Sequence, residues 1–260
     1  MGPHKASLMF IERYPDFPKY RVTLFGSLAA TGKGHLTDDA IEKVFQSAGK
    51  PVEIEWQPDT VLPRHPNAMK FEAFDPSGNK SAEWIAYSIG GGAVVDDNTT
   101  IESIARIYPF ENMAEILKFC NSNGLQFWEL VEKYEGKAIW GYLATVWETM
   151  QQAIHRGLEN EGVLPGPLHL PRKAASIHIK ATGYKGTLHK RALLFSYALA
   201  VAEENASGGI IVTAPTCGSC GVLPAVLFYF KNQYQFSEQK ILRALATAGL
   251  IGAIVKKNAS

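Results

Sequence analysis

The chain has 260 residues, enough for one large domain or two ordinary ones with a sizeable core. Its 26 lysines and arginines nearly balance its 25 aspartates and glutamates, so no net charge draws it to nucleic acid or to an anionic membrane. Three cysteines do not make the disulfide framework of a secreted domain. A signal peptide and a bilayer-spanning apolar run are not recognisable in the sequence. We therefore expect a cytoplasmic protein with a small neutral or zwitterionic ligand.

Four short runs in the first half alternate apolar with polar residues, which is typical of strands with one buried face. They are residues 20–25, 52–56, 69–74 and 84–88. The segment 38–45 has helical spacing and an acidic first turn. A polar, turn-prone stretch follows these elements. The pattern predicts a small α/β domain over residues 1–97 and a linker over residues 98–107.

The second half loses this alternation, and its apolar residues recur at every third or fourth position, the spacing of helices. The predicted helices are residues 139–158, 188–204, 223–232 and 238–257. The last two are apolar around most of their circumference, as expected inside a bundle. Residues 108–260 are thus predicted to form a mostly helical domain, and the whole chain is predicted to be an α+β protein.

The segment from Gly26 to His35 contains a Gly-Lys pair after a predicted strand, as phosphate-binding loops do. Its spacing differs from theirs, because five residues instead of four separate Gly26 from Gly32, and Gly34 stands where a Ser or Thr would reach magnesium. We interpret the segment as a flexible connection that leads to Thr37, a candidate N-cap of the next helix.

The three consecutive glycines after Ser88 end a predicted strand. Glycine is costly there unless the backbone needs a positive φ or a close approach to another group. The N–H groups of Gly90, Gly91 and Gly92 could hold a carboxylate. A plain bulge or chain reversal explains the glycines equally well, so both interpretations stay open.

The segment Thr213-Ala-Pro-Thr-Cys-Gly-Ser-Cys-Gly221, which we call the Thr213–Gly221 loop, joins the strand-like run 209–212 to a hydrophobic helix. N–H groups at a helix start favour an anion or a thiolate. Cys217 and Cys220 permit a redox pair or half of a zinc site, but Cys120 and scattered histidines do not supply a second spaced ligand pair. The alternative is two small cysteines that pack at the start of a helix.

Several motifs together resemble those of iron–sulfur-dependent L-serine dehydratases of the single-chain type. The catalytic-domain motifs are Gly157-Leu, Leu164-Pro-Gly, Arg172-Lys-Ala, Thr213-Ala-Pro-Thr, Gly221-Val-Leu-Pro-Ala and Lys257-Asn-Ala-Ser260. The motifs of the smaller β domain are Gly26-Ser-Leu, Thr31-Gly-Lys-Gly-His35 and Tyr87-Ser-Ile-Gly-Gly-Gly92. They occur in the family's order and cover essentially the whole chain.

This resemblance implies an enzyme that converts L-serine to pyruvate and ammonia without pyridoxal phosphate, with a 4Fe-4S cluster as the Lewis acid. It also implies a homodimer, no binding to nucleic acid or membrane, and a substrate site at the domain interface. The substrate-binding residues that it implies are Ser88, Gly90, Gly91, Gly92, Thr213, Thr216 and Asn258. It does not identify the base that removes the α-proton.

The sequence departs from the family pattern in three places. A Ser/His/Thr-rich stretch that precedes Gly2-Pro3 in the family is absent, the cysteine ligands of the cluster are expected beyond Ser260, and Cys217 stands where many members have Asn. The resemblance thus implies a chain truncated at both ends, without metal ligands of its own and inactive alone. The alternatives are a C-x-x-C thiol-redox protein and a non-catalytic amino-acid-binding module.

Overall fold

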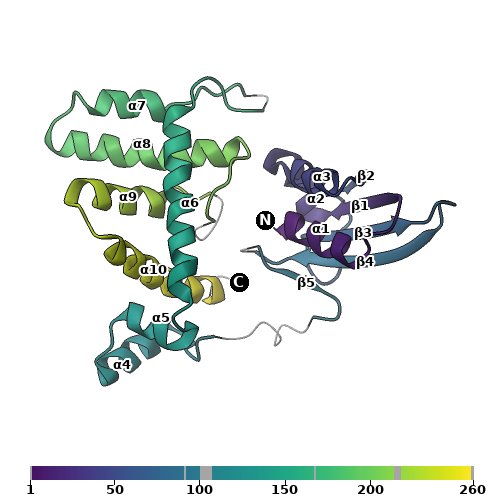
Figure 1. The fold of residues 1–260 in the computed structure, drawn as a ribbon, viewed down its shortest axis with the longest axis horizontal. Coiled ribbons are helices and arrows are strands. Elements are labelled where there is room, and N and C mark those ends of the chain that lie inside the picture. The colour runs from purple at the N-terminus through teal and green to yellow at the C-terminus, as the bar shows by residue number, and fades with distance from the viewer. Residues whose placement is uncertain (1, 91, 100–106, 167, 214–217, 259–260) are drawn as a thin grey trace. The chain divides into compact units, whose positions relative to one another are not determined.

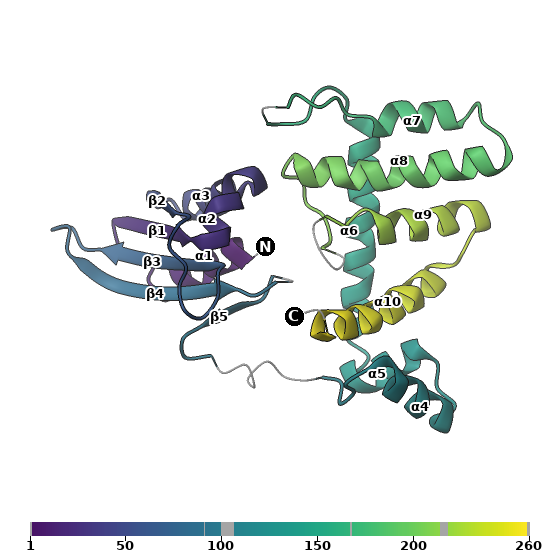
Figure 2. The same cartoon turned by 180° about the vertical axis from the view of Figure 1, so that it is seen from behind.

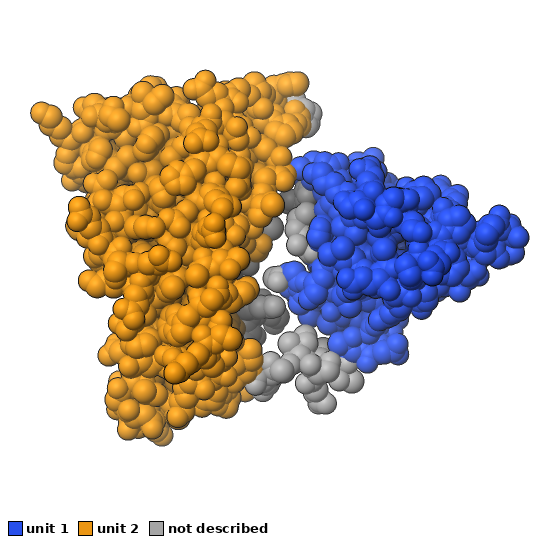
Figure 3. Space-filling model, in the orientation of Figure 1, with its two compact units in different colours: residues 1–105 blue, residues 106–260 orange. Residues whose placement is uncertain are grey.

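The computed structural model describes residues 2–90, 92–99, 107–166, 168–213 and 218–258. Its helices and strands appear in Figure 1. The chain divides into two compact units, Met1–Ala105 and Arg106–Ser260, which Figure 3 distinguishes by colour. Among the described residues, the sheet belongs to the first unit, while long helices make up the second. The predicted α+β fold class is confirmed.

The first unit is built on a five-stranded mixed sheet with the strand order β2-β1-β3-β4-β5. Its strands are β1 (Lys19–Phe25), β2 (Val52–Gln57), β3 (Ala68–Phe74), β4 (Lys80–Ser88) and β5 (Val94–Asp96). β1 and β2 run parallel, and the other neighbours are antiparallel. All four predicted strands are confirmed. The structure starts β4 four residues earlier than predicted and adds the short β5.

One face of this sheet carries the core of the first unit. The helices here are α1 (Gly2–Arg13), α2 (Gly26–Gly32) and α3 (Thr37–Ser47), with a single 3₁₀ turn, Lys33–His35, before α3. Phe10 of α1 packs against Tyr20 and Phe71, and Phe45 of α3 packs against Tyr20 from the same side. All four side chains are fully buried. The alternate apolar residues of β1, namely Tyr20, Val22 and Leu24, therefore belong to this core as the sequence predicts. Burial is more continuous than predicted, because Thr23 of β1 and Glu72 of β3 are buried as well.

The segment after β1 is a correction to the prediction, because it is helical rather than a flexible connection. Gly26 has a φ of +51° and turns the chain directly from the strand into α2, and a Cβ on it would lie 2.6 Å from the carbonyl oxygen of Pro66. The prediction of Thr37 as an N-cap is also wrong. Leu36 has the capping position, and Thr37 is the buried first residue of α3.

The second unit is helical throughout its regular structure. Its helices are α4 (Met113–Asn123), α5 (Phe127–Glu135), α6 (Ile139–Glu159), α7 (Ala174–Ala181), α8 (Gly186–Ala206), α9 (Val222–Tyr234) and α10 (Glu238–Asn258). The four predicted helices correspond to α6, α8, α9 and α10, whereas α4, α5 and α7 were not predicted as separate elements. Within the described residues, none of the helices combines the length and apolar character needed to cross a bilayer.

Helix α6 is the centre of this bundle. In Figures 1 and 2 it runs crosswise to α7, α8, α9 and α10, and it packs against all four. It contributes Trp147, Met150 and Ile154 to the core, and each of these side chains is at most 2% exposed. The stripe at every third or fourth residue therefore faces the other helices, as the sequence predicts.

Candidate functional site

Ser88 and the following glycines form the reversal between β4 and β5. Gly90 has a φ of +94° and Gly92 a φ of +74°, a region that only glycine enters without strain. The N–H of Ala93 donates to the carbonyl oxygen of Gly90 at 3.1 Å, and the N–H of Ile89 donates to that of Ala93 at 3.2 Å. The chain-reversal interpretation is confirmed, while the proposed carboxylate contact stays a prediction. Gly91 lies outside the described residues.

The start of α1 packs directly against the side chain of Ser88. A Cβ built on Gly2 would lie 2.2 Å from the Ser88 hydroxyl oxygen, so only a glycine fits there. The N–H of Ser88 donates to the carbonyl oxygen of Asn67 at 2.9 Å. Ser88 itself is half-buried. Neighbours on both sides therefore fix the position of this residue at the end of β4, and sequence reasoning missed the role of Gly2.

The other predicted substrate residues belong to the second unit. Thr213 is exposed and follows α8 in an irregular segment, whereas Thr216 lies outside the described residues together with Cys217. Asn258 is the last residue of α10, and its side chain is outside the described part of the chain. The structure thus brings Ser88, Gly90 and Gly92 together in one turn. Whether Thr213 acts with them stays a prediction.

The prediction that residues 209–212 are strand-like is wrong, because they have no regular secondary structure. Their backbone groups form hydrogen bonds with residues of helices instead. The N–H of Gly209 donates to the carbonyl oxygen of Glu204 at 2.8 Å, and the carbonyl oxygen of Ile210 accepts from the Arg156 guanidinium at 2.6 Å. Both partners are helical residues. The segment therefore packs along helix ends instead of joining a sheet.

Two adjacent glutamates near the end of α8 are buried, and sequence reasoning missed them. Glu203 Oε1 accepts from the backbone N–H groups of Lys173 and Ala174 at 2.6 and 3.2 Å, which caps the start of α7. Glu204 accepts from Arg156, Asn160 and Arg172. One feature of the sequence could have indicated their burial: the two adjacent charges follow the apolar residues Ala200 and Val201 in a predicted helix.

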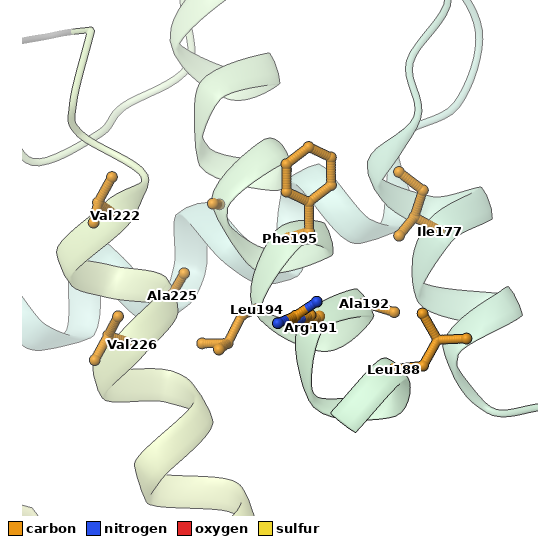
Figure 4. A pocket seen from close by; sticks show the side chains of 10 residues that line it. Ile177, Leu188, Arg191, Ala192, Leu194, Phe195, Val222, Ala225 and Val226 are labelled. Atoms are coloured by element: carbon orange, nitrogen blue, oxygen red, sulfur yellow. The ribbon is translucent and has the colours of Figure 1, made fainter. Parts of the chain in front are cut away.

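A groove of about 570 Å³ lies on the surface formed by α7, α8 and α9 (Figure 4). Figure 4 shows Ile177, Leu188, Phe195, Val222 and Val226 around it, with Arg191 as the charged residue of the lining. A small zwitterion needs several polar partners when it leaves water. This apolar lining supplies few of them, so we do not place the amino-acid site in the groove.

The cysteines of the described residues do not resemble a set of cluster ligands. Cys120 is buried in α4, and burial raises the pKa of its thiol, which disfavours the thiolate that iron requires. Cys220 is 1% exposed. In the described ranges, no three His, Cys, Asp or Glu side chains are grouped so that they could hold a metal ion. Cysteine thiolates hold the irons of such a cluster, so the described residues do not offer a ligand set that fits it.

Comparison with known proteins now identifies the class to which this α+β fold belongs. The sequence profile of the family described as Serine dehydratase alpha chain matches residues 69–260, from β3 of the first unit to the end of the chain. The protein belongs to this family. The resemblance to serine dehydratases that was inferred from the motifs is thereby confirmed.

Individual relatives extend the match to the whole chain. The L-serine dehydratase of Haemophilus influenzae is 34% identical over 313 residues, an alignment that covers all of this chain and 69% of the relative. The L-serine dehydratase TdcG of Escherichia coli is 35% identical with the same coverage of both chains. The L-serine dehydratase of Streptomyces coelicolor is 32% identical, again over all of this chain and 69% of its own length.

Proposed function

We propose that this protein serves as an L-serine dehydratase and binds L-serine through the Ser88–Gly92 turn and the Thr213–Gly221 loop. The observation that carries the proposal is the match of the whole chain to relatives named for this reaction, at 32 to 35% identity. In the reaction, loss of water across the Cα–Cβ bond of serine gives aminoacrylate. Hydrolysis of its imine tautomer then gives pyruvate and ammonia.

The turn after β4 suits the carboxylate of an amino acid. Successive backbone N–H groups in a glycine turn form a concave site for an anion, because no side chain stands in the way. We assign the carboxylate to the N–H groups of Gly90, Gly91 and Gly92 and a hydrogen bond to the Ser88 hydroxyl. Positive φ values at Gly90 and Gly92 support this assignment.

The Thr213–Gly221 loop supplies the second group of contacts in this proposal. We assign hydrogen bonds with the substrate to the hydroxyls of Thr213 and Thr216, and one to the Asn258 amide, all neutral groups that suit a zwitterion. Thr213 is exposed, which leaves its hydroxyl accessible to a ligand. We also propose that the protein forms a homodimer and acts in the cytoplasm.

The 4Fe-4S cluster that the resemblance implies would supply a Lewis acid for the serine hydroxyl when bound. The described cysteines, Cys120 and Cys220, do not fit it, and the described residues hold no group of metal ligands, so turnover through such a cluster needs ligands beyond these. We therefore propose that the 260-residue chain binds L-serine but produces no pyruvate by itself. Pyridoxal phosphate has no part in this proposal.

Anaerobic reconstitution with iron and sulfide tests the cofactor proposal. We expect the chain to retain far less than four irons per molecule and to form no pyruvate from serine. Stoichiometric iron with a visible charge-transfer band would refute the proposal that the chain lacks the ligands of a cluster. Iron-dependent formation of pyruvate would show that the chain is active alone. Serine binding without pyruvate formation would also fit the alternative of a non-catalytic amino-acid-binding module. An activity assay with a complete set of cluster ligands distinguishes that module from the dehydratase.

The thiol-redox alternative has less support from the structure. The Cys220 side chain is 1% exposed, whereas a dithiol that exchanges with solvent partners needs an accessible thiolate. Cys217 lies outside the described residues. A dithiol titration against glutathione buffers tests this directly, and a reversible redox couple in the absence of serine binding would favour this alternative over the dehydratase.

Serine binding tests the role of Ser88. Isothermal titration of Ser88→Ala should show affinity for L-serine reduced roughly tenfold, because one hydrogen bond to a charged group is worth about 1.5 kcal/mol. The matched control is Ser81→Ala, an exposed serine on the same strand, which should bind as the wild type does. Equal affinities of Ser88→Ala and the wild type would remove Ser88 from the site.

A further inference from the structure

The segment that leads into the Thr213–Gly221 loop has one side-chain partner that also contacts two helices. Arg156 lies in the last turn of α6, and its Nη2 donates to the carbonyl oxygen of Ile210 at 2.6 Å. The Nε of the same guanidinium donates to Glu204 Oε2 at 2.9 Å. Ile210 precedes Thr213 by three residues. Arg156 therefore links α6, α8 and the start of the loop through one rigid, planar group.

Glu204 fixes the orientation of this guanidinium. Its side chain is 5% exposed, and its second oxygen accepts from Asn160 Nδ2 at 3.0 Å and from Arg172 Nη1 at 3.5 Å. The Arg172 side chain is 8% exposed. A buried carboxylate that has donors on both oxygens has little freedom to rotate. Arg156 thus meets an acceptor whose position is already determined.

The backbone at Gly209 passes directly over this carboxylate. A Cβ on Gly209 would lie 2.7 Å from Glu204 Oε2, closer than a carbon and an oxygen approach without a shift. The N–H of Gly209 also donates to the carbonyl oxygen of Glu204. The path from Gly209 to Ile210 is consequently set by Glu204 on one side and Arg156 on the other.

The far end of the loop is also fixed on α8. A Cβ on Gly221 would lie 2.3 Å from the carbonyl oxygen of Ala198, and Cys220 beside it is buried. Gly209, before the loop, and Gly221, at its end, therefore both pack against α8, at Glu204 and at Ala198, which are six residues apart in that helix. The path before Thr213 depends on the charged side chain of Arg156, whereas the contact at Gly221 is between backbone atoms, so substitution of Arg156 can displace Thr213 while the packing at Gly221 stays intact.

We propose that Arg156 is a positioning residue for substrate binding, which acts by setting the backbone path that places Thr213. This inference rests on the proposed function, because it assumes that Thr213 contacts L-serine. Lysine at position 156 keeps the charge, but a single ammonium cannot reproduce the planar pair of hydrogen bonds to Glu204 and Ile210. The Arg156→Lys variant therefore separates the geometry of the guanidinium from its charge.

The test compares this variant with the wild-type chain by two measurements. Titration of L-serine should give a dissociation constant raised about tenfold, since small displacements of a binding group have large effects on a ligand that needs defined geometry. The ¹⁵N relaxation order parameters of residues 209–213 should fall from roughly 0.85, typical of rigid backbone, to below about 0.6. Unchanged affinity together with unchanged order parameters overturns the proposal.

Two controls separate positioning from general loss of stability. Arg191→Lys makes the same chemical change at an exposed position of α8 and should leave both measurements unchanged. Asn160→Ala removes one donor to Glu204 without touching Ile210, and Arg172 still donates to the same oxygen, so it should lower the melting temperature and cost much less serine affinity than Arg156→Lys. An Asn160→Ala variant that loses as much affinity as Arg156→Lys contradicts a specific role of Arg156.

A second variant covers the case in which Arg156→Lys does not fold. Gly209→Ala displaces the same segment from its other side, through the contact with Glu204 Oε2, and should lower serine affinity and the order parameters in the same way. If the wild-type chain binds no L-serine, the proposed function fails, and the order parameters alone then decide whether Arg156 positions the loop. Order parameters that stay at the wild-type level in both variants overturn the inference independently of serine.

Discussion

Gly157 of α6 and Ala200 of α8 lie so close together that a Cβ on Gly157 would be 2.2 Å from the Ala200 carbonyl oxygen. No side chain separates the two helix backbones at this crossing. Gly157 follows Arg156 directly in the sequence, and Ala200 precedes Glu204 by four residues, about one helical turn. The close approach of the helices therefore belongs to the same region as the ion pair that leads into the Thr213–Gly221 loop.

Gly157→Ala should therefore be strongly destabilising. The added methyl group overlaps a backbone carbonyl that cannot move without moving α8, and overpacking of this kind costs about 1 to 3 kcal/mol or more. Urea unfolding followed by circular dichroism measures the change. Gly141→Ala in the same helix is the matched control, because nothing lies within 4 Å of a Cβ there. It should stabilise the protein by up to about 1 kcal/mol through helix propensity. Equal effects of the two substitutions would contradict the close packing.

The cap of α7 by Glu203 gives a second prediction. Glu203→Ala removes the acceptor for the N–H groups of Lys173 and Ala174, and the loss of a buried cap should lower the free energy of unfolding by about 1 to 3 kcal/mol. Glu203→Gln keeps a carbonyl oxygen at the same place and should lose less than half as much. Chemical denaturation compares the two variants. A glutamine variant as unstable as the alanine variant would show that the charge, rather than the cap, stabilises α7.

The elements that could be predicted from the sequence are those whose apolar residues follow a simple period. β1 and α6 are such cases, since Val22 faces the core of the first unit and Met150 that of the second. α4 was missed although local signals were present. Asn112 Oδ1 accepts from the N–H of Glu115 at 3.1 Å, and Gly124 ends the helix with a φ of +64°. Its apolar stripe is short, so periodicity alone did not separate it from the following helix.

The residue types of the candidate site could be predicted from the sequence, but the tertiary contacts that hold them in place could not. Three glycines after a strand indicated a tight turn, and the structure has one at Gly90 and Gly92. The contact of Gly2 with Ser88 joins residues more than 80 positions apart. Likewise, Arg156 meets Glu204 from a distance of 48 residues in the sequence. Such pairings depend on tertiary packing, which one sequence without an alignment does not reveal.

Burial of His178 on α7 should make the stability of the protein depend on pH. Its Nδ1 lies 3.4 Å from the Ser196 hydroxyl, its ring packs against Tyr197, and burial lowers the pKa of its imidazole. Because the unfolded chain takes up a proton near pH 6.5 and the folded chain only at lower pH, the unfolded state binds more protons in between. The stabilisation from neutral His178 is therefore present above about pH 6.5 and is lost as the pH falls below that value.

Urea unfolding between about pH 5 and pH 7.5 measures this effect. The free energy of unfolding of the wild type, relative to His178→Gln, should decrease as the pH is lowered through the titration of histidine. His4→Gln is the control because His4 is exposed on α1. A difference between the wild type and His178→Gln that is constant with pH, or grows in acid, would contradict burial of a neutral imidazole.

Nuclear magnetic resonance of the ¹⁵N-labelled chain tests most directly the proposal that the Ser88–Gly92 turn and the Thr213–Gly221 loop bind L-serine. We expect titration with L-serine to shift the backbone amide signals of Gly90, Gly92 and Thr213 saturably, with much smaller shifts for D-serine at equal concentration. Signals that do not move, or that move equally with both enantiomers, would contradict the proposed site.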